Sequence, residues 1–151
     1  MTHLLAAWLS VLVVAAHVAA QPAAPREDEA IRRVLQAFYD GWNAHDPDRM
    51  IAVYADDIDH INVFGEWHKG KADIRADLAV LHAGPARNSE KQHTVEKIRF
   101  LGPEVAVAQV SSTSPNGMNL GTYVMQKQQG TWKVVSFTNV EPRKAPHKQT
   151  R

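Results

Sequence analysis

The chain opens its folded part with a helical pattern of hydrophobic positions. From residue 27 onward, apolar side chains recur three and four positions apart, which is the spacing of one face of an amphipathic helix. That face consists of Ile31, Val34, Leu35, Phe38, Tyr39 and Trp42. The spacing predicts a helix over residues 27–44. Asp46 and Pro47 then provide an N-cap and a first-turn proline, which predict a short second helix ending near Ala55.

After residue 57 the pattern changes to that of extended chain. Residues 58–64 are rich in Ile and Val and predict a strand, on which Trp67 and His68 are expected to pair back. A third helix is predicted between Gly70 and Gly84. Four β-rich runs separated by short turns follow, over residues 94–101, 105–112, 120–128 and 132–140. This order predicts an α+β domain, in which helices pack on one face of a curved, mostly antiparallel sheet.

The two ends of the chain differ from this domain in composition. Residues 1–20 contain a long apolar stretch that ends in small side chains, which is typical of a secretory signal peptide, with an uncleaved membrane anchor as the alternative. We therefore expect a periplasmic or secreted protein. Residues 21–26 are expected to form an extended linker, residues 27–141 the domain, and residues 142–151 a flexible basic tail.

Charge and composition exclude several classes of function. The 17 Lys and Arg side chains nearly balance the 16 Asp and Glu, so the net charge of +1 does not favour nucleic acid or, after signal cleavage, a membrane as partner. The absence of cysteine excludes thiolate chemistry. Neither a nucleotide-binding glycine motif nor a metal-binding histidine motif occurs, so we expect no cofactor and no metal.

Several short motifs, in their order along the chain, resemble one known superfamily. They are Tyr54-Ala-Asp-Asp57, then Gly65-x-Trp67-x-x-Gly70, and a meander that ends on the strand of Trp132. In this the chain resembles the nuclear-transport-factor-2-like superfamily, and most of all its SnoaL-like and SgcJ/EcaC-type proteins. The resemblance implies a cone-shaped fold with three N-terminal helices, a conical cavity between the first helix and the sheet, and a homodimer.

Ketosteroid isomerase is a more distant relative in this superfamily, and its mechanism is not expected here. In that enzyme an aspartate base follows the Tyr-Ala-Asp-Asp string at the fifth residue, where this chain has Asn62. An amide does not accept a proton at neutral pH. The position of the isomerase's oxyanion-binding tyrosine corresponds to Phe38, which has no donor group, although Tyr39 is adjacent.

Two residues of the first strand are the candidates for chemistry. Period-two alternation places His60, Asn62 and Phe64 on the same strand face as Ile58. The resemblance implies that this face lines the cavity. His60 is then a candidate acid or base, and Asn62 a candidate donor to a developing oxygen anion. The alternative is that His60 is hydrogen-bonded within the protein at the rim.

The other candidate ligand contacts come from the first helix, the loop after the first strand and the meander. They are Phe38, Trp42, Phe64, Trp67, Gln109, Phe137 and Asn139. The aromatic side chains would form apolar walls, and the amides would orient a polar group. Several of them have a structural alternative: the helix aromatics as core, Trp67 as a cover for the third helix, Asn139 as a strand cap, and Gln109 facing solvent or a dimer partner.

These residues favour a pocket for a small apolar molecule with a polar end. If the protein is an enzyme, we expect a cofactor-free isomerase or cyclase that transfers a proton at a carbonyl compound. The alternatives are a non-catalytic binding or carrier protein, and a dimeric interaction module whose cavity is filled by its own side chains.

Overall fold

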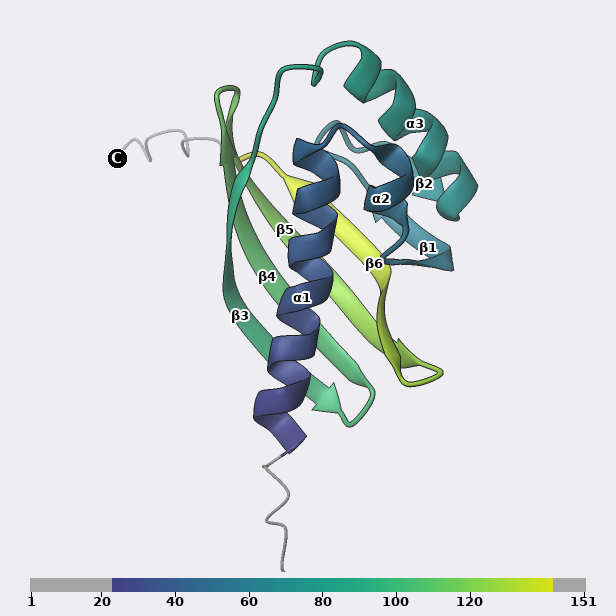
Figure 1. Ribbon diagram of the computed structural model, residues 1–151, viewed down its shortest axis with the longest axis vertical. Helices are drawn as coiled ribbons and strands as arrows, with labels where there is room; N and C mark the ends of the chain where they lie inside the picture. Colours follow the sequence, from purple (N-terminus) through teal and green to yellow (C-terminus); the bar gives the residue numbers. More distant parts are fainter. Residues whose placement is uncertain (1–22, 143–151) are drawn as a thin grey trace, which may run out of the picture.

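The computed structural model describes residues 23–142 as three helices and one six-stranded sheet. The elements are α1 (Ala23–Asn43), α2 (Pro47–Ile51), β1 (Tyr54–Ile61), β2 (Trp67–Lys69), α3 (Lys71–Ala83), β3 (Gln92–Gly102), β4 (Val105–Ser114), β5 (Gly117–Gln128) and β6 (Thr131–Val140). Helix α1 lies across one face of the sheet, and α2 and α3 lie beside it near β1 (Figure 1). The predicted α+β class is confirmed.

Helix α1 buries the predicted stripe against the sheet. Ile31 and Leu35 are fully buried, and Trp42 near the end of the helix is 8% exposed. The helix begins at Ala23, so residues 23–26 are helical where an extended linker was expected. Pro25 does not prevent this, because the amides of the first helical turn have no partner within the helix.

The second helix is shorter than predicted, and β1 begins earlier. Asp46 caps α2 as expected, since its Oδ1 accepts hydrogen bonds from the backbone N of Asp48 and Arg49, at 3.0 and 3.1 Å. The helix ends at Ile51, and Tyr54 already pairs with Val134 of β6. The helical spacing of Tyr54 was misleading because this residue is buried from a strand, with its ring stacked on Phe38 of α1.

The strand order of the sheet is β2-β1-β6-β5-β4-β3. Strands β3 to β6 form the predicted antiparallel meander, and β2 pairs antiparallel with β1 as expected. The contact between β1 and β6 is parallel, with His60 opposite Phe137. This contact places residues of β1 beside the inner face of the meander.

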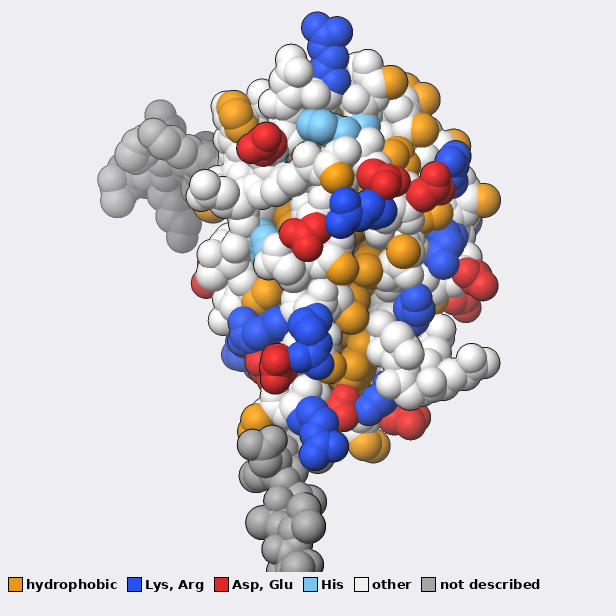
Figure 2. All heavy atoms as spheres, in the orientation of Figure 1, with side chains coloured by type: hydrophobic (Ala, Val, Ile, Leu, Met, Phe, Trp, Pro, Cys, Tyr) orange, Lys and Arg blue, Asp and Glu red, His pale blue; other side chains and the backbone are white. Residues whose placement is uncertain are grey.

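The two faces of the sheet have different environments. Side chains such as Ala108 and Tyr123 are buried beneath α1, whereas Gln109 and Thr122 on the other face are exposed. On the helix side, a strip of hydrophobic atoms runs between α1 and the strands, flanked by charged side chains (Figure 2). None of the helices within residues 23–142 is long and apolar enough to cross a membrane. The predicted signal peptide and all but the first residue of the predicted tail lie outside the described residues.

Candidate functional site

A cavity of about 280 Å³ lies between the second half of α1 and the sheet. It is bounded by α1, the end of β1 and the loop after it, α3 and its following loop, and the neighbouring ends of β4, β5 and β6. The cavity is where the resemblance placed it. Its existence in the described structure argues against an interaction module with a filled interior.

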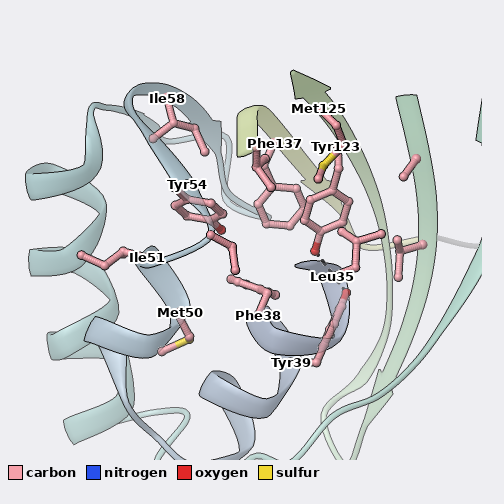
Figure 3. Close-up of a cluster of buried hydrophobic side chains, with 14 of the residues drawn as sticks. Leu35, Phe38, Tyr39, Met50, Ile51, Tyr54, Ile58, Tyr123, Met125 and Phe137 are labelled. Atoms are coloured by element: carbon pink, nitrogen blue, oxygen red, sulfur yellow. Dashed lines mark hydrogen bonds between the residues drawn. The ribbon is translucent and has the colours of Figure 1, made fainter. Parts of the chain in front are cut away.

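The deep wall of the cavity is aromatic. Phe38, Tyr39 and Trp42 line it from α1, and Tyr123 and Phe137 line it from the sheet. The Tyr123 and Phe137 rings stack with their centroids 4.1 Å apart, and the Phe38 ring meets the Phe137 ring edge-on (Figure 3). Such packed rings form a rigid apolar surface at low entropic cost. The predicted ligand contacts Phe38, Trp42 and Phe137 therefore all reach the cavity.

Two phenol groups provide hydrogen-bonding atoms on this wall. The hydroxyl oxygens of Tyr39 and Tyr123 lie 3.2 Å apart (Figure 3). Burial raises the pKa of Tyr39, and it raises the pKa of Tyr123 well above its usual value. Both groups are consequently neutral at physiological pH and retain their protons. Tyr39, which follows Phe38, provides the donor that Phe38 lacks.

His60 points to the same cavity from β1 and is only 6% exposed. Its ring stacks on Phe137 at 4.7 Å between centroids, and its Nδ1 has no hydrogen-bond partner among the described residues. Burial, with smaller contributions from the positive charges of His68 and Lys91, lowers the pKa of His60 to about 4. The side chain is therefore neutral at pH 7 and a weaker base than a histidine with the ordinary pKa.

Asn62 lines the cavity mouth, but its side chain is engaged in a turn. Its Oδ1 accepts hydrogen bonds from the backbone N of Phe64 and Glu66, at 3.0 and 3.1 Å. Its Nδ2 donates to Glu66 Oε2 at 2.7 Å. The strand ends at Ile61, so this residue belongs to the turn and not to the predicted strand. An amide with these partners orders the chain entering β2.

Lys91, which is not among the candidates predicted from the sequence, enters the cavity from the segment before β3. Its Nζ lies 3.7 Å from the centroid of the Trp42 ring. Burial lowers the pKa of Lys91 to about 8. Lys91 belongs to a polar stretch, Asn88-Ser-Glu-Lys91, that is typical of a solvated loop. The sequence thus contained no local signal for its position.

Of the remaining predicted ligand contacts, two line the cavity and two do not. Asn139 lines the cavity, and Phe64 stands at its rim with 79% of its surface exposed. Trp67 is 58% exposed and does not line it; its Nε1 donates to Asp59 Oδ1 at 2.8 Å. Gln109 lies on the opposite face of the sheet, beside Leu120. Its expected position in the cavity was wrong because Ala108 and Val110, not Gln109, face α1.

Three side chains at the mouth have an arrangement that could hold a metal ion. Glu66, His68 and Asp77 each offer one donor atom, and these atoms lie within 4.8 Å of one another. They also interact with protein groups: Glu66 accepts from Asn62, and His68 Nε2 lies 3.6 Å from Asp77 Oδ2. Contacts within the protein therefore account for this cluster without an ion.

Comparison with known families agrees with the fold. The SnoaL-like domain family matches residues 35–141. The chain belongs to this family, and with it to the nuclear-transport-factor-2-like superfamily. The sequence has no significant match among curated proteins.

Solved structures share the fold at low sequence identity. A domain of unknown function with a cystatin-like fold from Nostoc punctiforme has a TM-score of 0.73 and 20% identity, with 79% of each chain covered. An NTF2-like protein of unknown function from Shewanella baltica has a TM-score of 0.63 and 18% identity, with 80% of this chain and 97% of that chain covered. A ketosteroid isomerase-like protein from Erwinia carotovora atroseptica has a TM-score of 0.64 and 12% identity, covering 77% of this chain and 96% of that chain. At these identities the likeness extends to the fold alone.

Proposed function

We propose that this protein binds a small, largely apolar molecule with a polar end in the cavity beneath α1. The observation that carries the proposal is the cavity itself, which is close in volume to the smaller ligand pockets of proteins. Aromatic rings hold the body of the ligand. His60, Asn139 and the phenol groups of Tyr39 and Tyr123 provide hydrogen bonds to its polar end.

The low pKa of His60 favours a protein that binds its ligand without proton transfer by this residue. A histidine whose pKa is about 4 is unprotonated at neutral pH, so it does not serve as an acid there. Asn62 is committed to its turn. If the protein catalyses an isomerisation or cyclisation, the neutral hydroxyls of Tyr39 and Tyr123 are the better donors to a developing oxygen anion.

We also propose that the protein is exported and that cleavage follows Ala20. The apolar stretch of residues 4–20 supports this proposal. We also propose, from the resemblance of its sequence motifs, that the chain is of the SgcJ/EcaC type. Native mass spectrometry of the protein purified from its host periplasm tests export, because cleavage would leave a chain that begins at Gln21.

The binding proposal is tested with naphthalen-2-ylmethanol, a rigid apolar probe that carries one hydroxyl group. Isothermal titration calorimetry should show one site per chain. Ser112→Leu adds bulk to a buried side chain that lines the cavity, so it should weaken binding by about tenfold or more.

The matched control is Thr113→Leu, one residue along β4 on the exposed face, which should leave binding unchanged. Thermal unfolding of both variants confirms that they fold. Equal binding by the two variants, or no binding by the unmodified protein, would contradict the proposal.

A further inference from the structure

The backbone of Lys91 is fixed to the end of the long helix. Its N donates a hydrogen bond to Asn43 Oδ1 at 2.8 Å, and its carbonyl oxygen accepts one from Asn43 Nδ2 at 3.0 Å. Asn43 is the last residue of α1. Trp42, the residue before Asn43, lines the cavity. The two hydrogen bonds therefore direct the Lys91 side chain toward the Trp42 ring.

The amine at the end of this side chain is held by an aromatic ring and not by a carboxylate. The Nζ lies over the Trp42 ring, and none of the ion pairs among residues 23–142 involves Lys91. An aromatic face attracts an ammonium group but replaces its hydration only in part. With its pKa at about 8, roughly a tenth of the amine is unprotonated at pH 7, compared with well under a thousandth for an exposed lysine.

The charges around the cavity disfavour an anion as the partner of this amine. Glu66, Asp77 and Glu141 also line the cavity, so a ligand carboxylate or phosphate would meet three acidic side chains. A neutral electrophile encounters no such repulsion. A desolvated, partly unprotonated lysine in an apolar pocket has the properties of an amine that condenses with a carbonyl group.

We propose that the Nζ of Lys91 forms a reversible imine with an aldehyde or ketone group of the molecule bound in this cavity. The inference rests on the proposed function and specifies the chemical class of its ligand. The iminium ion that results keeps the positive charge over the Trp42 ring, which stabilises it, in a cavity that Glu66, Asp77 and Glu141 also line.

The reaction is a condensation without oxidation or reduction. The lone pair of Nζ attacks the carbonyl carbon, and the carbonyl π electrons move to oxygen. Transfer of a proton from nitrogen to oxygen gives a carbinolamine. The hydroxyl group takes up a proton from solvent and leaves as water, and the nitrogen lone pair forms the carbon–nitrogen double bond of the positively charged iminium ion. The neutral hydroxyls of Tyr39 and Tyr123 in the same cavity can hydrogen-bond to the departing oxygen.

The proposal is tested by trapping the imine in the full-length protein. Naphthalene-2-carbaldehyde is added at about pH 7 with sodium cyanoborohydride, which reduces an imine to a stable amine, and peptide mapping locates the label. Lys91 should be labelled on the order of a hundredfold faster than exposed lysines, because of its larger unprotonated fraction. The labelling rate should rise with pH, with a midpoint near 8.

Lys91→Arg keeps the positive charge but does not form the imine, so it should abolish this label. The matched control, Lys97→Arg on an exposed position of β3, should leave it unchanged. Labels spread evenly over exposed lysines, or an unchanged rate in Lys91→Arg, would overturn the proposal.

Naphthalen-2-ylmethanol separates this inference from the proposed function, because it has no carbonyl group. If the protein binds this alcohol but gives no Lys91 adduct with the aldehyde, the imine is refuted and the binding function stands. If it binds neither compound, both proposals fail. If the unmodified protein binds the alcohol and also gives the Lys91 adduct with the aldehyde, both proposals stand.

Discussion

At the scale of the residue, Gly121 shows how closely the cavity wall is packed. A Cβ at this position would lie 2.9 Å from both Phe137 Cε2 and Tyr123 Cε2. The stacked rings thus occupy the space that any larger residue would need. Gly121 is therefore required by the aromatic wall and not by a turn.

We predict that Gly121→Ala destabilises the protein by about 1–3 kcal/mol, because the two rings must move apart. Ligand binding should weaken as well, since both rings line the cavity. Gly102→Ala is the matched control, because a Cβ there has no atom within 4 Å. Urea denaturation measures both variants, and equal losses of stability would contradict the prediction.

His60 predicts a dependence of stability on pH. Between its ordinary pKa of 6.5 and its folded value of about 4, the unfolded chain binds a proton that the folded protein excludes. Stability should therefore fall as the pH is lowered through this window, with a loss on the order of 3 kcal/mol from this group when it is complete. His82, whose pKa burial also lowers to about 4, adds to the same trend.

His60→Leu removes this contribution and should flatten the pH dependence. The free energy of unfolding is measured by urea denaturation at about pH 7 and about pH 4.5. His82→Leu should reduce the remaining slope. If His60→Leu lowers the free energy of unfolding by the same amount at both pH values, the folded protein does not exclude a proton from His60.

At the scale of the element, the spacing of hydrophobic residues predicted most of the helices and strands. Where that prediction was wrong, contacts between residues far apart in the sequence explain the difference. Ile31 and Leu35 repeat at helical spacing because one partner, the sheet, buries them both. Tyr54 belongs to a strand because of Val134, which lies eighty residues later and has no sequence signal linking it to Tyr54. Lys91 reached the site for a similar reason, since Asn43 holds it.

The turn between β1 and β2 depends on a single amide. We predict that Asn62→Ala destabilises the protein by about 1–3 kcal/mol, because the backbone N of Phe64 and of Glu66 both lose their acceptor. Asn88→Ala, in the exposed turn after α3, is the control and should have little effect. Thermal unfolding compares the two. A loss as small as that of the control would mean that the turn forms without this side chain.

At the scale of the whole molecule, the uncovered face of the sheet bears on the expected homodimer. Leu120 and Val140 are 42% and 50% exposed there, next to Gln109. Within residues 23–142 the three helices lie on the other face. Burial of these side chains between two copies would be consistent with the superfamily resemblance.

We predict that the protein elutes as a dimer and that Leu120→Lys shifts it to the monomer, since a buried interface does not tolerate unpaired charges. Val80→Lys, on an exposed position of α3, should leave the dimer intact. Size-exclusion chromatography with light scattering measures the mass. A monomeric unmodified protein would exclude the dimer at the concentration tested.

The position of β6 between β1 and β5 has a consequence for synthesis of the protein. The last strand of the domain is an interior strand, so β1 lacks its parallel neighbour until residue 140 has left the ribosome. Until then, the sheet that buries the apolar face of α1 lacks β6, and this face is only partly covered. Nascent chains that stop before Trp132 should consequently be substrates for chaperones and proteases rather than smaller folded proteins.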